Sequence, residues 1–323
     1  MPTAPPAPTP PVAERRLCFV LGKGGVGKST VAAALALSLA RDGHRTLLIE
    51  VAAQQRVSAL FGDAAIGHAA PTELAPGLFA ISIDPEHATE DYLVSQLHVR
   101  PLVEMLTHSR AFHNFAAAAP GLSELVTVGK IWSLAVALRE GGDAPVWDRL
   151  VVDCPATGHG LALLETAGNV EELAASGPIR DQARRIQQVI THPAATGVMV
   201  VARPQELPVS EAAEATAHLR RHGLPVAAAV MNGMGARRFG PDDEAPLRAA
   251  AAGSADDVRA AAGLALAHLD RQRAEDAYAR RLAAETGLPV TVLPRIVRPM
   301  DRDALAVLAD ALGEGVPARE PAT

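Results

Sequence analysis

The stretch that decides the fold reads Leu17-Cys-Phe-Val-Leu-Gly-Lys-Gly-Gly-Val-Gly-Lys-Ser29. Its five leading apolar residues have the pattern of a buried β-strand. The glycines that follow predict a turn, and the alanine- and leucine-rich stretch from Lys28 to about Arg41 predicts a helix that ends before Gly43. The spacing fits G-x-x-x-x-G-K-[ST] between a strand and a helix, which indicates a loop that cradles phosphate groups.

Each residue type in this loop suits a nucleotide. Glycines let backbone N–H groups curl around an anion, and the start of the helix adds partial positive charge. Lys28 can reach the β- and γ-phosphates, Ser29 can ligate Mg²⁺, and Thr30 can donate to the α-phosphate. The predicted binding residues are Gly22, Gly24, Gly25, Val26, Gly27, Lys28, Ser29 and Thr30.

A second motif lies at Val151-Val-Asp-Cys-Pro-Ala-Thr-Gly-His159. Residues 146–153 predict a buried strand with Asp153 at its carboxyl end, which is where open α/β sheets bind ligands. Asp153 is therefore predicted to hold the water shell of Mg²⁺ together with Ser29. Gly158 would let this loop move with the γ-phosphate.

Strands and helices alternate along the rest of the chain. Further strands are predicted at 44–50, 78–83, 197–202, 225–231 and 289–293, with helices at 208–222, 242–286 and 301–312. Near-continuous apolar strands separated by helices predict an α/β fold, doubly wound, with a mostly parallel sheet covered on both faces. The predicted organisation is a Pro-rich disordered tail at 1–14, one domain at 15–315 with a helical insertion at about 86–140, and a short disordered tail at 316–323.

Composition excludes several classes of protein. The net charge of -6 over 323 residues disfavours nucleic acid as a partner, because a nucleic-acid-binding protein carries a basic face. The only cysteines, Cys18 and Cys154, are too far apart for a ligand motif, so no disulfide scaffold and no zinc are expected and a cytoplasmic location is predicted. No apolar stretch reaches the ~20 residues that span a bilayer.

The two motifs resemble those of the ArsA-type ATPases, the family of arsenical-pump and tail-anchored-protein-targeting ATPases. Residues 23–29 resemble the family's deviant P-loop, and residues 153–159 resemble its switch II, Asp-Thr-Ala-Pro-Thr-Gly-His. The segment Val230-Met-Asn232 resembles the family's adenine-reading segment, and Leu293-Pro-Arg-Ile-Val-Arg298, which contains Pro294, resembles its adenine-covering loop. The resemblance covers residues 17 to about 312 and implies ATP and Mg²⁺ as cofactors, with Asn232 and Pro294 beside the adenine.

The resemblance also implies a dimer. Lys23, early in the loop, would act across the interface on the partner's nucleotide, and the alternative is a solvated loop lysine. The pump enzyme joins two ATPase halves whereas this chain has one, which implies a homodimer or a heterodimer with a paralogous ATPase. A membrane-protein partner is left open. A partitioning ATPase that acts on DNA or membrane is disfavoured by the acidic charge and the proline-broken C-terminal stretch.

One segment departs from the family pattern. The switch I aspartate that activates water would fall at Ala52, which offers no acid or base. Glu50 lies on the same face of the strand and is the candidate substitute, while Gln54 or Gln55 could position a water. Two hypotheses follow. The chain is an ATPase in which Lys23, Lys28, Asp153 and Glu50 carry catalysis, or it is a hydrolysis-deficient nucleotide-binding subunit that pairs with a catalytic paralogue.

Overall fold

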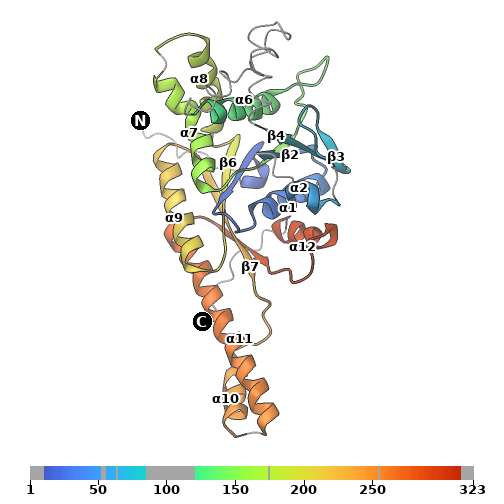
Figure 1. Ribbon diagram of the computed structural model, residues 1–323, viewed down its shortest axis with the longest axis vertical. Helices are drawn as coiled ribbons and strands as arrows, with labels where there is room; N and C mark the ends of the chain where they lie inside the picture. Colours follow the sequence, from blue (N-terminus) through green and yellow to red (C-terminus); the bar gives the residue numbers. More distant parts are fainter. Residues whose placement is uncertain are drawn as a thin grey trace, which may run out of the picture.

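The structure, a computed structural model, describes residues 11–51, 56–62, 65–84, 121–173, 175–253 and 255–313. Its strands are Leu17–Gly22 (β1), Thr46–Val51 (β2), Thr72–Ala75 (β3), Leu78–Ile83 (β4), Arg149–Asp153 (β5), Thr196–Ala202 (β6), Val226–Met234 (β7) and Val290–Pro294 (β8). They form one sheet in the order β3-β4-β2-β5-β1-β6-β7-β8 (Figure 1). All neighbouring strands are parallel except the edge pair β3 and β4, so the predicted mostly parallel sheet is confirmed.

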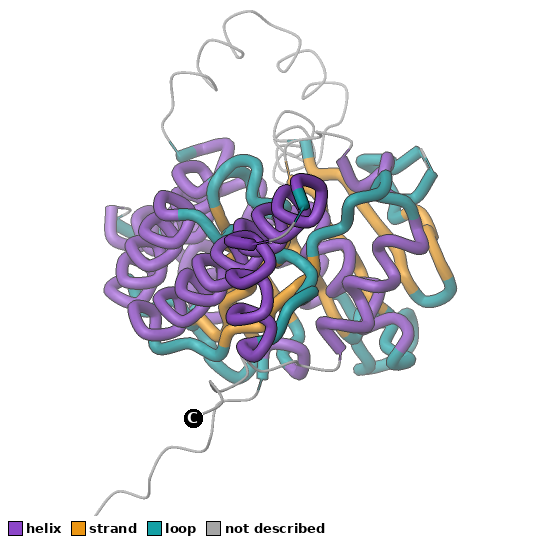
Figure 2. The backbone as a smooth tube through the Cα atoms, turned by 90° about the horizontal axis from the view of Figure 1, so that it is seen from below, coloured by secondary structure: helices purple, strands orange, loops and turns teal. Residues whose placement is uncertain are grey.

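Helices cover both faces of this sheet. They are Lys28–Arg41 (α1), Arg56–Leu60 (α2), Leu122–Val136 (α6), Thr157–Leu173 (α7), Pro178–Ile190 (α8), Glu206–Arg221 (α9), Glu244–Gly253 (α10), Asp256–Thr286 (α11) and Arg302–Gly313 (α12), with short 3₁₀ helices at Val12–Glu14 and Pro241–Asp243. One face packs against α1, α2 and α12, and the other against α6, α7, α8 and α9 (Figure 1). Figure 2 shows helices on both sides of the strands. The predicted doubly wound α/β fold is therefore confirmed.

The central strand β1 shows why the sheet lies between two helical layers. All of its residues are buried, and its side chains alternate between the layers. Cys18 and Val20 belong to the core under α1, whereas Leu17, Phe19 and Leu21 belong to the core under α7. A strand that is apolar on both faces is stable only when both faces are covered, which is the arrangement seen here.

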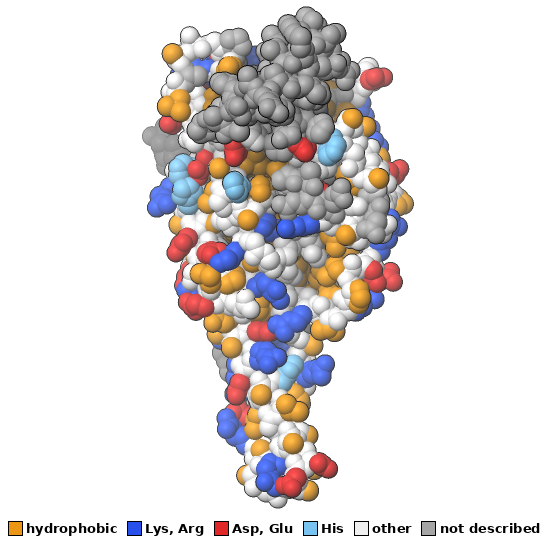
Figure 3. Space-filling model, in the orientation of Figure 1, with side chains coloured by type: hydrophobic (Ala, Val, Ile, Leu, Met, Phe, Trp, Pro, Cys, Tyr) orange, Lys and Arg blue, Asp and Glu red, His pale blue; other side chains and the backbone are white. Residues whose placement is uncertain are grey.

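The structure differs from the predicted elements in several places, including the following three. The strand predicted at 146–153 is shorter, because only Arg149–Asp153 pairs with its neighbours. The antiparallel edge strand β3 has one buried residue in four, so its sequence carried no apolar run to reveal it. The helical stretch predicted at 242–286 is two helices, α10 and α11, which pack side by side and project from the body (Figure 1). Side chains of both charge signs intermix on this projection (Figure 3).

Two other predicted segments lie partly outside the described residues. Of the predicted insertion, residues 86–120 are outside them, and α6 belongs to its remaining part. Of the predicted N-terminal tail, residues 1–10 are outside them. Val12–Glu14 forms a 3₁₀ helix next to Arg15, whose guanidinium donates to the Thr196 carbonyl at 2.9 Å. Among the described helices, none combines the length and apolar character needed to cross a membrane.

Candidate nucleotide site

The candidate site lies at the carboxyl ends of three central strands. β5 runs between β1 and β2, and in this register Asp153 is opposite Val20 on one side and Glu50 on the other. Side chains two residues apart share a strand face. Because Leu48 and Val151 belong to the core under α1, Glu50 and Asp153 project toward the same layer as α1. The fold thus brings both predicted acids to the start of the helix that follows the glycine loop.

The backbone of the loop requires its glycines. Gly25 and Gly27 have φ angles of 84° and 93°, in the left-handed region that side chains disfavour. A β-carbon on Gly22 would lie 2.5 Å from the Val201 carbonyl oxygen, and one on Gly27 would overlap the Asn232 amide. These positions therefore exclude larger residues, as expected of a loop whose backbone closely approaches an anion.

Lys28 lies inside this loop. Its side chain is buried, and its Nζ donates to the Lys23 carbonyl at 3.1 Å. Burial lowers the pKa of Lys28, and the nearby Asp153 carboxylate partly offsets that effect. The cation is thus held next to the phosphate loop by a contact that a phosphate oxygen could replace.

Asp153 is a buried carboxyl group with unused hydrogen-bonding capacity. Its exposed fraction is 5%, and burial raises its pKa to about 6. A hydrogen bond from Ser29 and the Lys28 charge oppose this rise, whereas the charge of Glu50 adds to it. Within the residues that the structure describes, no group hydrogen-bonds to its Oδ1.

Glu50 is also buried, with 2% exposed, and it has two different oxygens. Its Oε1 accepts the backbone N–H groups of Arg56 at 2.8 Å and Val57 at 3.3 Å, at the start of α2. Its Oε2 has no hydrogen-bond partner among the described residues. Asp153 hydrogen-bonds with Ser29, and Asp153 and Glu50 each keep one orphaned carboxylate oxygen. Such oxygen groups match the ligands and water shell that Mg²⁺ prefers, so these residues fit the ion that the motif implies.

The structure brings Asn232 to the loop and places Pro294 at the end of the neighbouring strand. Asn232 Nδ2 donates to the Val26 carbonyl at 2.8 Å, which ties β7 to the glycine loop. Pro294 ends β8 opposite Met234 and is exposed. Both residues are therefore at the same edge of the sheet as the phosphate loop. Their adenine contacts stay predictions.

Lys23 has a partner that sequence reasoning missed. Its Nζ forms an ion pair with Glu211 of α9 at 2.5 Å. Both residues line an open cavity of about 680 Å³, together with residues 156–158 from the loop after Asp153. Lys23 and Glu211 lie 188 positions apart, so no local pattern could have revealed the pair.

A second ionic network was also missed, next to Asn232 and Pro294. Glu275 of α11 is buried, and its oxygens accept the Gly235 N–H and the Arg295 guanidinium, both at 2.6 Å. Arg295 also donates to the Gly233 carbonyl at 3.1 Å. This network joins the ends of β7 and β8 to α11.

Three residues of the segment that departs from the family pattern lie outside the described ranges, namely Ala52, Gln54 and Gln55. The two cysteines are described, and both are buried and free. Burial raises the pKa of Cys18 to about 12 and that of Cys154 well above its usual value. Both cysteines therefore remain protonated at neutral pH, as expected of small residues packed in the core.

The parallel sheet, the glycine loop and the two strand-end acids define an α/β protein of the P-loop nucleoside-triphosphatase class. A model of the family described as Anion-transporting ATPase matches residues 15–177. The chain is 31% identical to the ATPase BagA of Mycobacterium tuberculosis over 320 residues, which cover 93% of each chain. The chain therefore belongs to the anion-transporting ATPase family, as its motifs predicted.

Two further relatives match part of the chain. The arsenical pump-driving ATPase of Acidiphilium multivorum is 28% identical over 233 residues, covering 67% of this chain and 39% of that protein. The ATPase GET3B of Arabidopsis thaliana is 26% identical over 268 residues, covering 68% of this chain and 64% of that protein. The relatives thus include an arsenical pump-driving ATPase, one of the groups named in the sequence resemblance.

Proposed function

We propose that this chain binds ATP with Mg²⁺ at the glycine loop and hydrolyses it to ADP and phosphate. One observation carries the proposal: Glu50 and Asp153 are two buried carboxylates with orphaned oxygens, they are neighbours in the sheet register, and Asp153 lies next to Lys28 and Ser29 at the start of α1. Buried carboxylate oxygens without hydrogen-bond partners are unfavourable unless a cation or a reaction uses them. The family relationship supports ATP as the nucleotide.

Each residue has a role in this proposal. The backbone N–H groups of residues 22–27 would bind the phosphates, and Lys28 would exchange the Lys23 carbonyl for phosphate oxygens. Ser29 and Asp153 would hold Mg²⁺, directly or through its waters, and the ion would neutralise charge on the phosphates. Catalysis of this kind depends on charge stabilisation and positioning.

Glu50 is the proposed general base. Its Oε2 would take a proton from a water whose oxygen attacks the γ-phosphorus, and ADP would leave with the electrons of the broken P–O bond. Because its Oε1 is bonded to the first N–H groups of α2, the base is held by the segment that follows β2. Glu50 would thereby take over the task of the missing switch I aspartate at Ala52.

We also propose that the working unit is a dimer, of two identical chains or with a paralogue, coupled to a client or a membrane-protein partner. Lys23 would act on the partner chain's nucleotide, which requires its ion pair with Glu211 to open. That pair is about one-third exposed, and such pairs stabilise a protein by about 1 kcal/mol or less. Breaking it on dimer formation therefore needs little free energy.

A second candidate function rests on the same segment. Ala52 has only a methyl side chain, and one carboxylate oxygen of Glu50 already accepts a hydrogen bond from the first residue of α2. If that contact holds Glu50 away from the water, the chain would bind ATP without cleaving it and would act as the nucleotide-binding partner of a catalytic paralogue.

Single-turnover hydrolysis of labelled MgATP by the full chain tests both candidates, with Lys28→Ala as the blank. We expect ADP release above the blank and a large loss of it in Glu50→Gln. ATP that is retained but uncleaved would support the second candidate. No retention of ATP by the wild-type chain, with circular dichroism showing a folded protein, would overturn both.

A further inference from the structure

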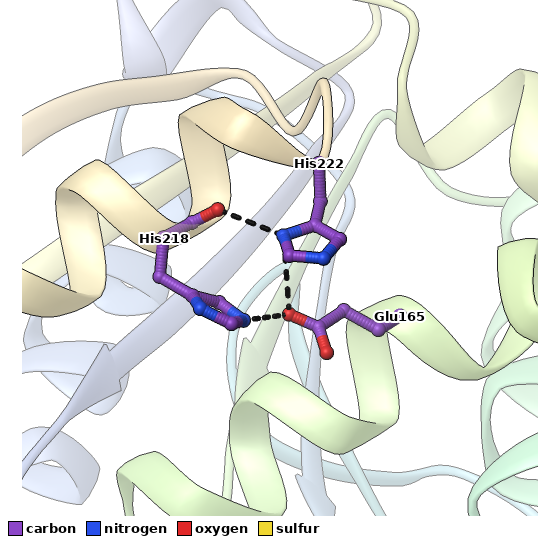
Figure 4. Close-up of side chains that lie close together, drawn as sticks. All are labelled: Glu165, His218 and His222. Carbon is purple, nitrogen blue, oxygen red and sulfur yellow. Dashed lines mark hydrogen bonds and ion pairs between the residues drawn. The ribbon is translucent and has the colours of Figure 1, made fainter.

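A cluster of possible metal ligands lies on the helices α7 and α9, which pack on the same face of the sheet. Glu165 belongs to α7, His218 to the last turn of α9, and His222 follows the end of α9. Residues four apart share one side of a helix, so the two histidines project together. Figure 4 shows both imidazole rings turned toward the Glu165 carboxylate.

The three side chains meet at one carboxylate oxygen. Nε2 of His218 is hydrogen-bonded to Oε1 of Glu165, and Nδ1 of His222 lies 3.7 Å from the same oxygen. Nδ1 of His222 also lies 2.9 Å from the His218 carbonyl oxygen. One potential ligand atom from each of the three residues lies within 4.8 Å of the others. To share one ion, His218 and Glu165 would have to separate, and the His222 ring would have to turn from the His218 carbonyl toward them.

The ligand set selects the class of metal. Two imidazoles and one carboxylate suit Zn²⁺ and similar transition metals, whereas Mg²⁺ and Ca²⁺ prefer oxygen ligands. The side chains of Glu165, His218 and His222 are 17%, 33% and 45% exposed, so the cluster is partly sheltered with one side open to water. A zinc ion bound by three protein ligands can take a water molecule as its fourth ligand, and the open side of this cluster leaves room for one.

One positive charge lies near the cluster, but it does not exclude a bound metal ion. The guanidinium of Arg221 is 3.4 Å from Nδ1 of His218, on the ring nitrogen that does not contact Glu165. The positive charge of Arg221 disfavours a bound cation, and the negative charge of the Glu165 carboxylate offsets that effect. The metal would take the place of the hydrogen bond between His218 and Glu165. A neutral His218 would bind through Nε2 with its ring proton on Nδ1, which requires the Arg221 guanidinium to move away from Nδ1.

We propose that Glu165, His218 and His222 bind a zinc-type divalent transition-metal ion that ties α7 to α9. These helices border the open cavity that also contains Lys23 and Glu211. The ion would thus fix the spacing of the helix that follows the Asp153 loop and the helix that holds Lys23. The expectation of no zinc rested on cysteine spacing alone, and this site departs from it through the histidine pair.

Calorimetric titration of the full chain, stripped of metal and free of nucleotide, with Zn²⁺ tests the proposal. We expect one saturable equivalent. Loss of outer ligands alone weakens metal sites by about 10–100-fold, so His218→Ala and His222→Ala should each weaken binding by at least ~10-fold. His192→Ala removes an exposed histidine elsewhere and should leave the affinity unchanged. Co²⁺ in place of Zn²⁺ should give visible absorption bands that Glu165→Gln alters.

Two further variants make the result decisive. Lys28→Ala should retain Zn²⁺ binding, because Lys28 belongs to the nucleotide site and not to this cluster. The metal proposal is thereby tested independently of ATP hydrolysis. His222→Gln preserves hydrogen bonding if His222→Ala impairs folding, as judged by circular dichroism. Wild-type affinity no higher than that of the folded His218→Ala/His222→Ala double variant would overturn the proposal.

Discussion

Two regions of this molecule bury carboxylates, and they differ in whether the carboxylate oxygens have hydrogen-bond partners. In α11, both oxygens of Glu275 have hydrogen-bond partners: one accepts the Gly235 N–H and the other accepts the Arg295 guanidinium. At the phosphate loop, Glu50 and Asp153 each leave one oxygen without a hydrogen bond from the described residues. Their like charges are also neighbours in the sheet register.

The contrast separates a structural acid from a functional one. Removing a carboxylate from water is unfavourable unless hydrogen bonds and opposite charge compensate for the loss. The chain supplies that compensation to Glu275 itself. For Asp153 it leaves the compensation incomplete, as the raised pKa shows, and an external cation would complete it. The predictions below test this distinction.

The largest effect is expected from Asp153→Asn. The variant removes the charge that would hold Mg²⁺, so the rate of ATP hydrolysis should fall by about 10²–10³-fold, as for loss of one main electrostatic contact. The nucleotide-free protein should be equally stable or more stable, because a buried charge has gone. Steady-state phosphate release and urea unfolding measure the two effects. Asp310→Asn, at an exposed ion pair with Arg41, is the matched control.

The stability of the metal-free protein should also depend on pH through Asp153. Its pKa is about 6 in the folded state against 3.8 unfolded, so between these values the folded state binds more protons. Stability therefore falls as pH rises through this window, by about 3 kcal/mol for this group. The measurement is the difference in unfolding free energy between wild type and Asp153→Asn from pH 4 to 7. A difference that is constant across that range would contradict the assignment.

Glu275→Gln should have the opposite signature to Asp153→Asn. It leaves the Arg295 guanidinium without its buried partner, so the unfolding free energy should fall by about 2 kcal/mol. The affinity for Mg²⁺ should be unchanged, because Glu275 lies outside the phosphate loop. Urea unfolding and Mg²⁺ titration check the two statements. If instead Glu275→Gln is neutral and Asp153→Asn is destabilising, the distinction between the regions is wrong.

The smallest effect on stability is expected from Glu211→Gln. The ion pair with Lys23 is partly exposed, so its loss should change the unfolding free energy by less than about 1 kcal/mol. Freed of its partner, Lys23 would be available to a second chain, and the ATPase rate at saturating nucleotide should rise. Glu214→Gln, on the same helix and lining the same cavity, is the control. A lower rate would contradict the proposed role of Lys23.

What could be predicted from the sequence was local. The glycine loop, Lys28 and Asp153 belong to short motifs whose spacing follows from phosphate and Mg²⁺ binding, and the strands beside them are continuous apolar runs. The pairs that the structure added join distant positions. Glu211 meets Lys23 across 188 residues, and Glu165 meets His218 across 53. Such contacts depend on how helices pack, which periodicity in a single sequence does not specify.

The long helix α11 has a mechanical consequence. Glu275 fastens it to the loops after β7 and β8, close to Asn232 and the phosphate loop. The part of α11 that precedes Glu275 is about 28 Å long, at about 1.5 Å per residue. A tilt of about 10° at this pivot would sweep the far end of the helix through about 5 Å. A small movement of α11 near the proposed nucleotide site would therefore displace the far end of the helix by about the length of a side chain.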